Sequence, residues 1–582
     1  MNFETIKSFF TKKYFFYFIV LEFLLISVTL LELIGIGLVP LFISLVIDSS
    51  LLQKYLPLQV YNYINANFSS DNFILYGAVL LFTVFFFKNF LIINYEYIHA
   101  NIIKKIRLKL ALAVFSKYLE KDYQFFIYSS KSDIIRTLTS DVSKAISFFM
   151  ELIKLSKEII FCIGLFIFVC LLNPYIAIGS VLIFSFLILI FYNLVKKKLK
   201  KLGELINFQL EQQFKVINES VDSIKEIIMM EKQGNIKNIF EKKVNDVEKN
   251  VFINHFIHSL SKPIVEIVSV FAVLLVSFYF VINSYESKLL IPILSLTGVI
   301  IIRLIPTFNG ISRSLSTIVY LYPAFENLVK KINDNSHDQE VKQQKNIEFE
   351  NISFKNVFFS YEGNKNKVIL NNLNFEIFKG DKFGIYGPSG SGKSTLLDLL
   401  SGLLDPDEGQ ILINKKIDLR DSKLNWRKKI GYAPQFNCFL DDTLEKNITF
   451  FEDKNIIKRN FLDQSIIKSN LKSFVIKNLE GLDFKIGEKG VRLSGGEKQR
   501  VSIARSIYNQ PEIIILDETT NSLDEKTESE ILSNFSKNFS EKTIIIISHK
   551  LKTFNFCDKI ICLDNGKIEN ILSRKDFFKK FS

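Results

Sequence analysis

The stretch KFGIYGPSGSGKSTLLDLL, residues 382–400, decides the fold of the second half of this chain. It holds the pattern G-x-x-x-x-G-K-[ST] between a short β-like run and an apolar helix-like run. Glycines let backbone N–H groups close around phosphates, Lys393 reaches the outer phosphates, and the Ser394 hydroxyl can ligate Mg²⁺. The predicted phosphate-binding residues are Gly387, Ser389, Gly390, Ser391, Gly392, Lys393, Ser394 and Thr395.

Two further apolar runs end in polar side chains. EIIILDE, residues 512–518, reads as a strand buried on both faces that presents Asp517 and Glu518 at its carboxyl end, where α/β sheets bind ligands. We expect Asp517 to hold Mg²⁺ and Glu518 to polarise the attacking water. KTIIIISHK, residues 542–550, ends on His549 in the same way. A lone histidine is more often a satisfied core residue, but this one converges on the phosphate site.

The run RLSGGEKQR, residues 492–500, resembles the signature sequence of ATP-binding cassette (ABC) proteins, and the whole chain resembles an exporter half-transporter. In that family the aromatic at Tyr361 stacks on adenine, Gln435 in GYAPQ senses Mg²⁺ and the membrane domain, and Asp524 in NSLD lies at a dimer interface. One departure is Glu497, where glutamine is commoner, and we expect a modest effect. The resemblance implies catalytic roles for Lys393, Gln435, Glu518 and His549, Mg²⁺ ligation by Ser394, Gln435 and Asp517, and nucleotide contacts from Tyr361, Ser494, Gly495, Gly496 and Asp524.

The same resemblance implies head-to-tail dimers in which two ATP molecules, each with Mg²⁺, lie between one subunit's phosphate loop and the other's signature. One chain carries one copy of each motif, so a working unit needs two chains. Both Glu518 and His549 are present, which favours a homodimer with two active sites over a heteromer with one degenerate site.

The first half is a membrane domain by composition. The chain is 48% hydrophobic, with a mean hydropathy of +0.21. A spanning helix needs ~20 apolar residues, and each of six segments is long enough. These segments are approximately 14–47, 73–98, 146–172, 175–195, 263–284 and 288–327.

The charge distribution orients these segments. The net charge of +13 arises from 73 basic and 60 acidic residues, and lysine-rich connections occur at 102–110 and 196–201. Positive loops stay in the cytoplasm, so we expect a multi-pass membrane protein with a cytoplasmic nucleotide-binding domain, and the family resemblance implies the bacterial inner membrane. The basic charge then meets anionic membrane lipid or solvent, and no nucleic-acid motif accompanies it, so we expect no nucleic-acid partner.

The expected fold class is an all-α membrane domain of six long transmembrane helices, of the ABC exporter type, followed by an α/β P-loop nucleotide-binding domain. The predicted boundaries are 1–335 for the membrane domain, 336–350 for a polar linker and 351–582 for the nucleotide-binding domain. Residues 122–142 and 225–240 resemble the two intracellular coupling loops of exporters. Residues 51–70 read equally well as a short external amphipathic helix or as a loop.

A charged residue interrupts the sixth apolar segment: IIRLIPTFNG, residues 301–310, carries Arg303 three residues before the helix-unfriendly Pro306. At 1.5 Å per residue, Arg303 lies about 24 Å from the outer end of its helix. Lys88 in the second segment lies at a similar depth, and Arg313 would add a lower tier. Intramembrane charges either pair internally, here with Glu22 or Glu32, or meet a substrate. Physics alone leaves both explanations open.

RLIPTFNGI resembles the corresponding stretch of bacterial exporters that flip lipid-linked oligosaccharides for protein glycosylation. This implies an anionic substrate with a polyprenyl pyrophosphate, which the planar fork of arginine binds well. We therefore expect an ATPase that acts as a flippase, with Lys88, Arg303 and Arg313 as candidate substrate contacts. The alternatives are export of lipid A core, a drug or a peptide, and an ATP-gated channel, which the intact Glu518 disfavours.

Overall fold

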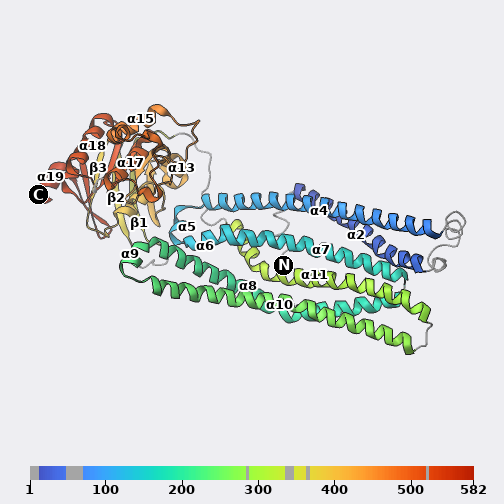
Figure 1. The fold of residues 1–582 in the computed structure, drawn as a ribbon. Helices are drawn as coiled ribbons and strands as arrows, with labels where there is room; N and C mark the ends of the chain where they lie inside the picture. The colour runs from blue at the N-terminus through green and yellow to red at the C-terminus, as the bar shows by residue number, and fades with distance from the viewer. Residues whose placement is uncertain are drawn as a thin grey trace. The chain divides into compact units, whose positions relative to one another are not determined.

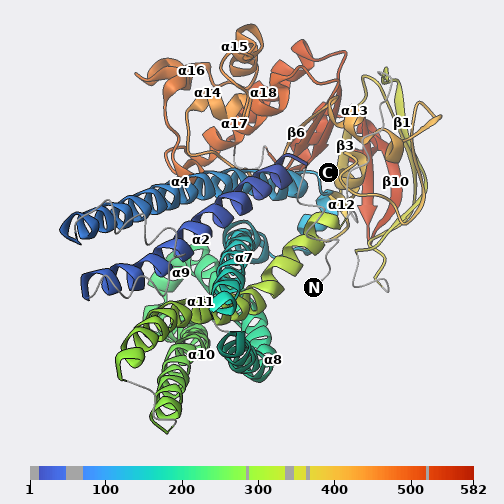
Figure 2. The same ribbon diagram turned by 90° about the vertical axis from the view of Figure 1, so that its right-hand side faces the viewer.

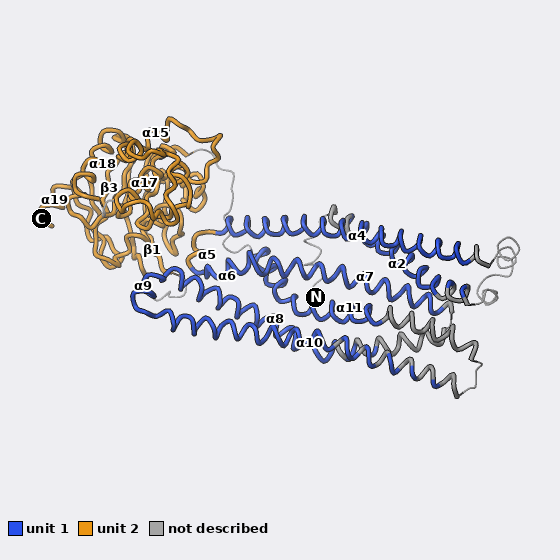
Figure 3. Tube along the Cα trace, viewed as in Figure 1, with its two compact units in different colours: residues 1–121, 128–337 blue, residues 122–127, 338–582 orange. Residues whose placement is uncertain are grey.

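The computed structural model describes residues 12–47, 70–172, 174–282, 287–334, 347–361, 367–519 and 523–581. The chain divides into two compact units (Figure 3). The membrane unit comprises residues 1–121 and 128–337, and the second unit comprises residues 122–127 and 338–582. The sequence boundaries at 335 and 351 stay a prediction.

Six helices of 31 to 50 residues build the described part of the membrane unit (Figure 1). They are α2 (Lys12–Ile47), α4 (Ser70–Leu119), α7 (Val142–Leu172), α8 (Pro174–Asp222), α10 (Gln233–Ile282) and α11 (Ser287–Asn333). Among the described residues, the stretches 19–39 and 74–119 are long and apolar enough to cross a membrane. The helix α11 continues through Pro306, as membrane helices packed against neighbours can.

Short elements join these helices. They are α5 (Tyr123–Tyr128), α6 (Lys131–Arg136), a π-helical turn (Thr137–Asp141) and α9 (Ile224–Met229). The sequence stretches that resemble the coupling loops are therefore helical. The apolar side chains of Ile228, Met229 and Met230, at the end of α9, are exposed.

The membrane helices pack through aromatic rings and close backbone contacts. Phe148 of α7 and Phe325 of α11 stack with their centroids 4.7 Å apart. At Gly203 of α8, a Cβ atom would lie 2.3 Å from the carbonyl oxygen of Tyr320 in α11. A side chain cannot fit there, so glycine sets the approach of these two helices.

The second unit contains two sheets (Figure 2). A four-stranded antiparallel sheet has the order β2-β1-β4-β5, and a six-stranded sheet has the order β10-β9-β3-β8-β7-β6, parallel except at β10. The strands are β1 (Asn351–Phe359), β2 (Leu370–Phe378), β3 (Lys382–Tyr386), β4 (Glu408–Ile413), β5 (Ile417–Asp418), β6 (Ile430–Ala433), β7 (Ile513–Asp517), β8 (Thr543–Ile547), β9 (Lys559–Asp564) and β10 (Lys567–Ser573).

Helices cover both faces of the parallel sheet. They are α12 (Lys393–Leu400), α13 (Lys423–Arg427), α14 (Leu444–Thr449), α15 (Arg459–Lys468), α16 (Lys472–Lys477), α17 (Gly495–Tyr508), α18 (Glu525–Asn538) and α19 (Arg574–Phe581). Short 3₁₀ turns lie at Leu419–Asp421, Gly481–Asp483, Glu488–Gly490 and Leu551–Phe556. In Figure 2, α14, α15, α16 and α17 gather on one side of this unit and β1 and β10 on the other.

The central strands are buried on both faces, as the continuous apolar runs predict. Ile513 and Ile515 of β7 join the core between the two sheets, whereas Ile514 and Leu516 join the core on the opposite face. Since β3, β7 and β8 are neighbouring parallel strands, their carboxyl ends meet at one edge. This edge carries the phosphate loop and the polar residues described next.

Candidate functional site

The phosphate loop connects β3 to α12 in a conformation that requires glycine. Gly390 has φ +80° and Gly392 has φ +100°, in the left-handed region that L side chains rarely adopt. A Cβ on Gly390 would meet nothing within 4 Å, so the loop is open on that side. The Oγ of Ser391 is buried and has no hydrogen-bond partner among the described residues. An open glycine cradle with an orphaned hydroxyl fits a phosphate group.

Lys393 is folded back onto the loop. Its Nζ donates to the carbonyl oxygens of Gly387, at 2.9 Å, and Pro388, at 2.8 Å. Burial lowers the pKa of Lys393, while the carboxylates of Glu518 and Asp517 act in the opposite direction. The ammonium group is therefore held in the cradle by weak neutral acceptors, which an anionic phosphate can replace.

The Glu518 carboxylate contacts two of the other three predicted catalytic side chains. Its Oε1 lies 2.8 Å from His549 Nε2, and its Oε2 accepts a hydrogen bond from Gln435 Nε2 at 2.7 Å. The backbone of Glu518 has φ +50°, which is uncommon for a non-glycine residue and typical of functional sites. The structure thus brings Gln435, Glu518 and His549 together, although their catalytic roles stay a prediction.

Asp517 is buried beside a hydroxyl that the motifs did not mark. Tyr432 of β6 donates from its OH to Asp517 Oδ2 at 3.0 Å. Burial raises the pKa of Asp517, and burial together with the Asp517 charge raises the pKa of Asp398 to about 6. The Asp517 carboxylate, which accepts from Tyr432 and repels the Asp398 carboxylate, suits a divalent cation, because a cation would offset that repulsion.

Tyr361 and the signature occupy separate positions around the domain. The hydroxyl of Tyr361 lies 3.3 Å from Thr395 Oγ1 in α12. Ser494 caps the amino end of α17 and forms a capping box with Glu497, whose Oε2 accepts from the Ser494 amide at 2.8 Å. The departure at Glu497 therefore has a local structural use, because glutamate is a normal capping-box residue.

The remaining predicted nucleotide contacts lie at helix starts. Gly495 and Gly496 open α17, and Ser394 lies exposed in the first turn of α12. Asp524 caps α18 by accepting from the Thr527 amide at 3.0 Å, and this hydrogen bond lowers the Asp524 pKa. In the NSLD run, Asn521 and Ser522 lie outside the described residues.

The donor set fits ATP with Mg²⁺. The glycine cradle and Lys393 would hold the phosphates, and Asp517, Ser394 and Gln435 offer the oxygen ligands that Mg²⁺ prefers. Tyr432 and Asp398 are the additions that sequence reasoning missed. The available signal was the position of Tyr432 in a strand that neighbours β7, three residues before Gln435.

In the membrane unit, helix registers bring Glu32 and Lys88 to one level. A Cβ on Gly35 of α2 would lie 3.1 Å from the ring of Phe85 in α4, and Leu25 packs in one cluster with Tyr95. These antiparallel contacts place residue 32 opposite residue 88. Lys88 is 7% exposed, and its Nζ lies 4.8 Å from the centroid of the Phe85 ring.

Two further registers bring Arg303 to the same level. A Cβ on Gly164 of α7 would lie 2.8 Å from Leu33 of α2, whereas a Cβ on Gly310 of α11 would lie 2.7 Å from Glu158 of α7. Extending the antiparallel α7–α11 register by seven residues puts the α11 backbone at residue 303 near residues 162–165. The side chain of Arg303 lies outside the described residues.

The other predicted membrane residues have different surroundings. Glu22, a proposed counter-ion, accepts a hydrogen bond from Ser156 Oγ at 2.8 Å. Arg313 is exposed on α11, ten residues beyond Arg303. The possible external helix at 51–70 falls almost entirely outside the described residues.

Comparison with known protein families agrees with both halves. Residues 370–521 match the family described as ABC transporter, and residues 18–304 match the family described as ABC transporter transmembrane region. The chain is 27% identical to the ATP-dependent lipid A-core flippase 2 of Colwellia psychrerythraea over 498 residues, which are 84% of each chain. It is 37% identical to the ATM1-type heavy metal exporter of Novosphingobium aromaticivorans over 229 residues, which are 39% of this chain and 37% of the relative.

A solved structure shares the fold over nearly the full length. The structure of a bacterial Atm1-family ABC exporter with ATP bound has a TM-score of 0.83 and covers 98% of this chain and 96% of its own, at 20% identity. Both the predicted fold class and the predicted cofactors, ATP with Mg²⁺, are confirmed. The chain belongs to the ABC transporters and is a membrane-embedded, multi-pass exporter half-transporter that hydrolyses ATP.

Proposed function

We propose that this exporter is a flippase for a lipid-linked oligosaccharide, working as a homodimer in the bacterial inner membrane. The substrate assignment rests on the charged positions that lie at one depth of the membrane unit. Among the described residues, buried Lys88 and the α11 backbone at residue 303 share that level with Glu32, and Glu158 of α7 lies about one to two helical turns away, against Gly310. Two basic positions at this level in each subunit favour an anionic amphiphile such as a polyprenyl pyrophosphate glycan, whose tail can remain in lipid.

One relative supports an amphiphilic substrate without fixing it. The lipid A-core flippase of Colwellia psychrerythraea, as named, moves a lipid, and its alignment covers most of both chains. Lipid A-core export is therefore the second candidate. The heavy metal exporter aligns over 39% of this chain, too small a share to assign its substrate to this protein.

We infer that Glu518 accepts the proton of the attacking water. His549 Nε2, at 2.8 Å, would hold one carboxylate oxygen in place, and Gln435 contacts the other. Bound ATP with Mg²⁺ supplies the γ-phosphoryl group and the metal charge that stabilises its transfer. Lys393 would move from its carbonyl acceptors to the phosphates, and Asp517, held by Tyr432, would ligate the metal.

The homodimer follows from the motifs. In the signature, Ser494 and Gly495 are exposed and Gly496 is half-buried at the start of α17, so the signature can serve a second copy. Because one chain has one phosphate loop and one signature, two copies complete two sites.

The testing experiment reconstitutes the purified protein in proteoliposomes and follows ATP-dependent movement of a polyprenyl-pyrophosphate oligosaccharide. The Glu518→Gln variant is the blank, and a parallel set of vesicles contains lipid A core. Movement of the oligosaccharide by the wild type alone is the expected result. Movement of lipid A core alone would identify lipid A core as the substrate in place of the oligosaccharide. Steady ATP turnover without movement of either lipid would reject both as substrates.

A further inference from the structure

The chain passes between its two compact units three times, at 121/122, 127/128 and 337/338. Described residues of the membrane unit that flank these crossings contact one another. Lys121, which follows α4 and is buried, donates from Nζ to the carbonyl oxygen of Asp334, which follows α11. The ends of α4 and α11 are therefore tied together within the membrane unit.

The second crossing leads directly into a buried group of charges. Arg136, at the end of α6, is 5% exposed, and Asp141, at the end of the π-helical turn, is 0% exposed. Arg136 Nη1 donates to both carboxylate oxygens of Asp141, at 3.0 and 2.8 Å, while Nη2 donates to Asp133 at 2.6 Å. The guanidinium fork thus spans the π-turn, a feature that is often found at functional sites.

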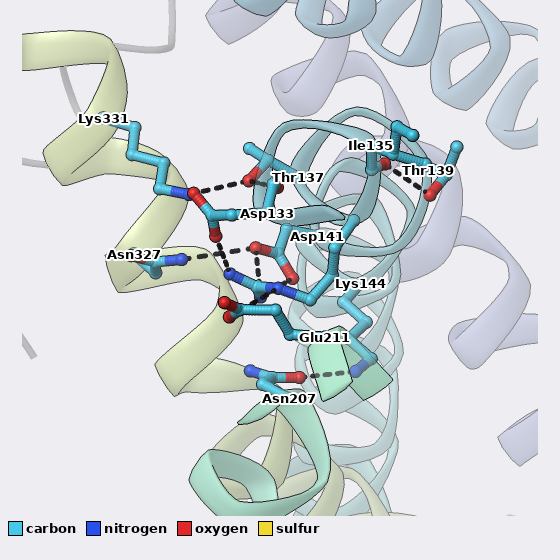
Figure 4. Close-up of polar contacts among 11 residues, drawn as sticks. Asp133, Ile135, Thr137, Thr139, Asp141, Lys144, Asn207, Glu211, Asn327 and Lys331 are labelled. Carbon is cyan, nitrogen blue, oxygen red and sulfur yellow. Dashed lines mark hydrogen bonds and ion pairs between the residues drawn. The ribbon is translucent and has the colours of Figure 1, made fainter. Parts of the chain in front are cut away.

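Side chains from two other helices complete this group (Figure 4). From α8, Glu211 Oε2 lies 3.7 Å from Arg136 Nε, and Asn207 accepts from Lys144 Nζ at 2.5 Å. From α11, Lys331 Nζ donates to Asp133 Oδ2 at 2.5 Å and to Thr137 Oγ1 at 2.8 Å, and Asn327 donates to Asp141 at 3.3 Å. We call this set the Arg136 cluster, and it comprises Asp133, Arg136, Thr137, Asp141, Lys144, Asn207, Glu211, Asn327 and Lys331.

The charges of the Arg136 cluster balance. Its acids are Asp133, Asp141 and Glu211, and its bases are Arg136, Lys144 and Lys331. Replacing a buried ion pair with apolar side chains is often neutral or stabilising, so such a pair is weak evidence for a stabilising role. Removing one partner is strongly unfavourable, because the other charge then lies buried and unpaired. A balanced, directional cluster therefore resists sliding of one helix along another more strongly than apolar contacts do.

We propose that Arg136 and Lys331 are positioning residues for coupled transport. The Arg136 cluster holds α6, α7, α8 and α11 as one body at the point where the chain enters and leaves the second unit. A displacement of segment 122–127, which belongs to the second unit, then moves all four helices together. This role goes beyond the proposed flippase function, because it applies to whichever substrate the exporter moves.

The experiment measures hydrogen–deuterium exchange of the full-length protein in lipid vesicles, with and without ATP and Mg²⁺, in the Glu518→Gln background. Lys331→Met removes the charged link to α11 at a partly exposed side chain and leaves the Asn327 hydrogen bond to Asp141 in place. Lys330→Met is the matched control. Lys330 is the neighbour of Lys331, its side chain is 73% exposed, and it pairs with Glu326 on the same helix. Basal ATPase is measured on the same substitutions with Glu518 intact.

In the reference protein we expect ATP to change exchange in residues 131–141, 207–222 and 323–334 together. Lys331→Met should reduce the ATP-induced change at 323–334 by at least about fivefold, the lower end of usual coupling factors, with basal ATPase within about twofold. Lys330→Met should behave as the reference. Arg136→Lys keeps the charge without the fork and should loosen α8 directly, through Glu211, and α11 indirectly, through Asp133 and Asp141. If that variant fails to fold, Glu211→Gln tests the α8 link.

A purely structural cluster gives a different pattern: faster exchange without ATP, but an unchanged ATP-induced difference. That pattern, or equal behaviour of Lys331→Met and Lys330→Met, would overturn the proposal. The exchange measurement needs no transported substrate. A failure of the oligosaccharide assay therefore leaves this result interpretable, and the two proposals fail separately.

Discussion

The ATP site and the Arg136 cluster both bring buried carboxylates to cations, but they assemble them differently. At the ATP site, short contiguous motifs place Lys393, Asp517 and His549 at the ends of parallel strands that meet at one edge. In the Arg136 cluster, the charges come from residues between 133 and 331 on separate helices. The sheet edge gathers side chains through the backbone, whereas the helix bundle gathers them through packing alone. The first kind of site is therefore visible in a sequence, and the second is not.

The largest expected effect tests the sheet edge. Glu518→Gln should lower ATP hydrolysis by about 10²–10⁴-fold, the usual contribution of a general base, while ATP binding persists. Phosphate release measures turnover, and a fluorescent nucleotide measures binding. Near-normal hydrolysis would show that Glu518 is not the base. The sequence motif would then have failed to identify a catalytic residue at the sheet edge.

The next effect concerns the membrane unit, where side chains meet through packing. Arg303→Ala should lower transport by at least about tenfold, corresponding to ~1.4 kcal/mol or more, with basal ATPase largely intact. The reason is the loss of an oxyanion contact for the substrate. The proteoliposome assay measures transport, and size-exclusion chromatography measures folded protein.

Glu32→Gln is the companion variant, because Glu32 lies at the level of Arg303. If Arg303 contacts substrate, Glu32→Gln should retain transport. An equal loss of folded protein in both variants would instead assign Arg303 to internal pairing with Glu32.

A smaller effect is expected for Tyr432, which lies in the ATP site but outside the sequence motifs. Its contact with Asp517 depends on the packing of neighbouring strands, so it tests a packing contact within a site built from motifs. Tyr432→Phe removes a hydrogen bond to a carboxylate, and such bonds contribute about 1.5–3 kcal/mol. Because only part of this energy acts on the transition state, we expect ATPase to fall about 3–10-fold, which corresponds to about 0.7–1.4 kcal/mol, with a higher Mg²⁺ concentration at half-maximal rate. Tyr508→Phe, which removes a hydroxyl bond to Glu452, is the control. An unchanged Mg²⁺ dependence would reduce Tyr432 to a packing residue.

The smallest effect concerns the signature. Glu497→Gln preserves the capping box, since glutamine also completes it, so ATPase should stay within about twofold. Glu497→Ala removes one partner and should lower stability by about 0.3–1.5 kcal/mol. Thermal unfolding measures the second change. A large ATPase loss in Glu497→Gln would give the carboxylate a role beyond capping.

Sequence reasoning succeeded where the backbone decides the outcome. The strand and helix around the phosphate loop appear as β3 and α12, and β7 ends on Asp517 as its apolar run predicts. It could not foresee Tyr432, because the contact depends on a side chain from a neighbouring strand.

In the membrane unit, apolar length identified the six long helices but not their registers. The level shared by Glu32 and Lys88 became visible only through the close contact at Gly35. Arg136 and Asp141, five residues apart, pair across a π-turn, a geometry that ordinary helical periodicity does not suggest.

The second unit is discontinuous in sequence, because six residues from the middle of the membrane half complete it. A chimera that exchanges residues 338–582 between two exporters would therefore combine the new domain with residues 122–127 of the original protein. Natural recombination faces the same constraint. The two units can be exchanged between exporters only when residues 122–127 are exchanged with the second unit or already match it. The second unit can therefore be exchanged only as two separate segments, and no single cut in the chain separates it from the membrane unit.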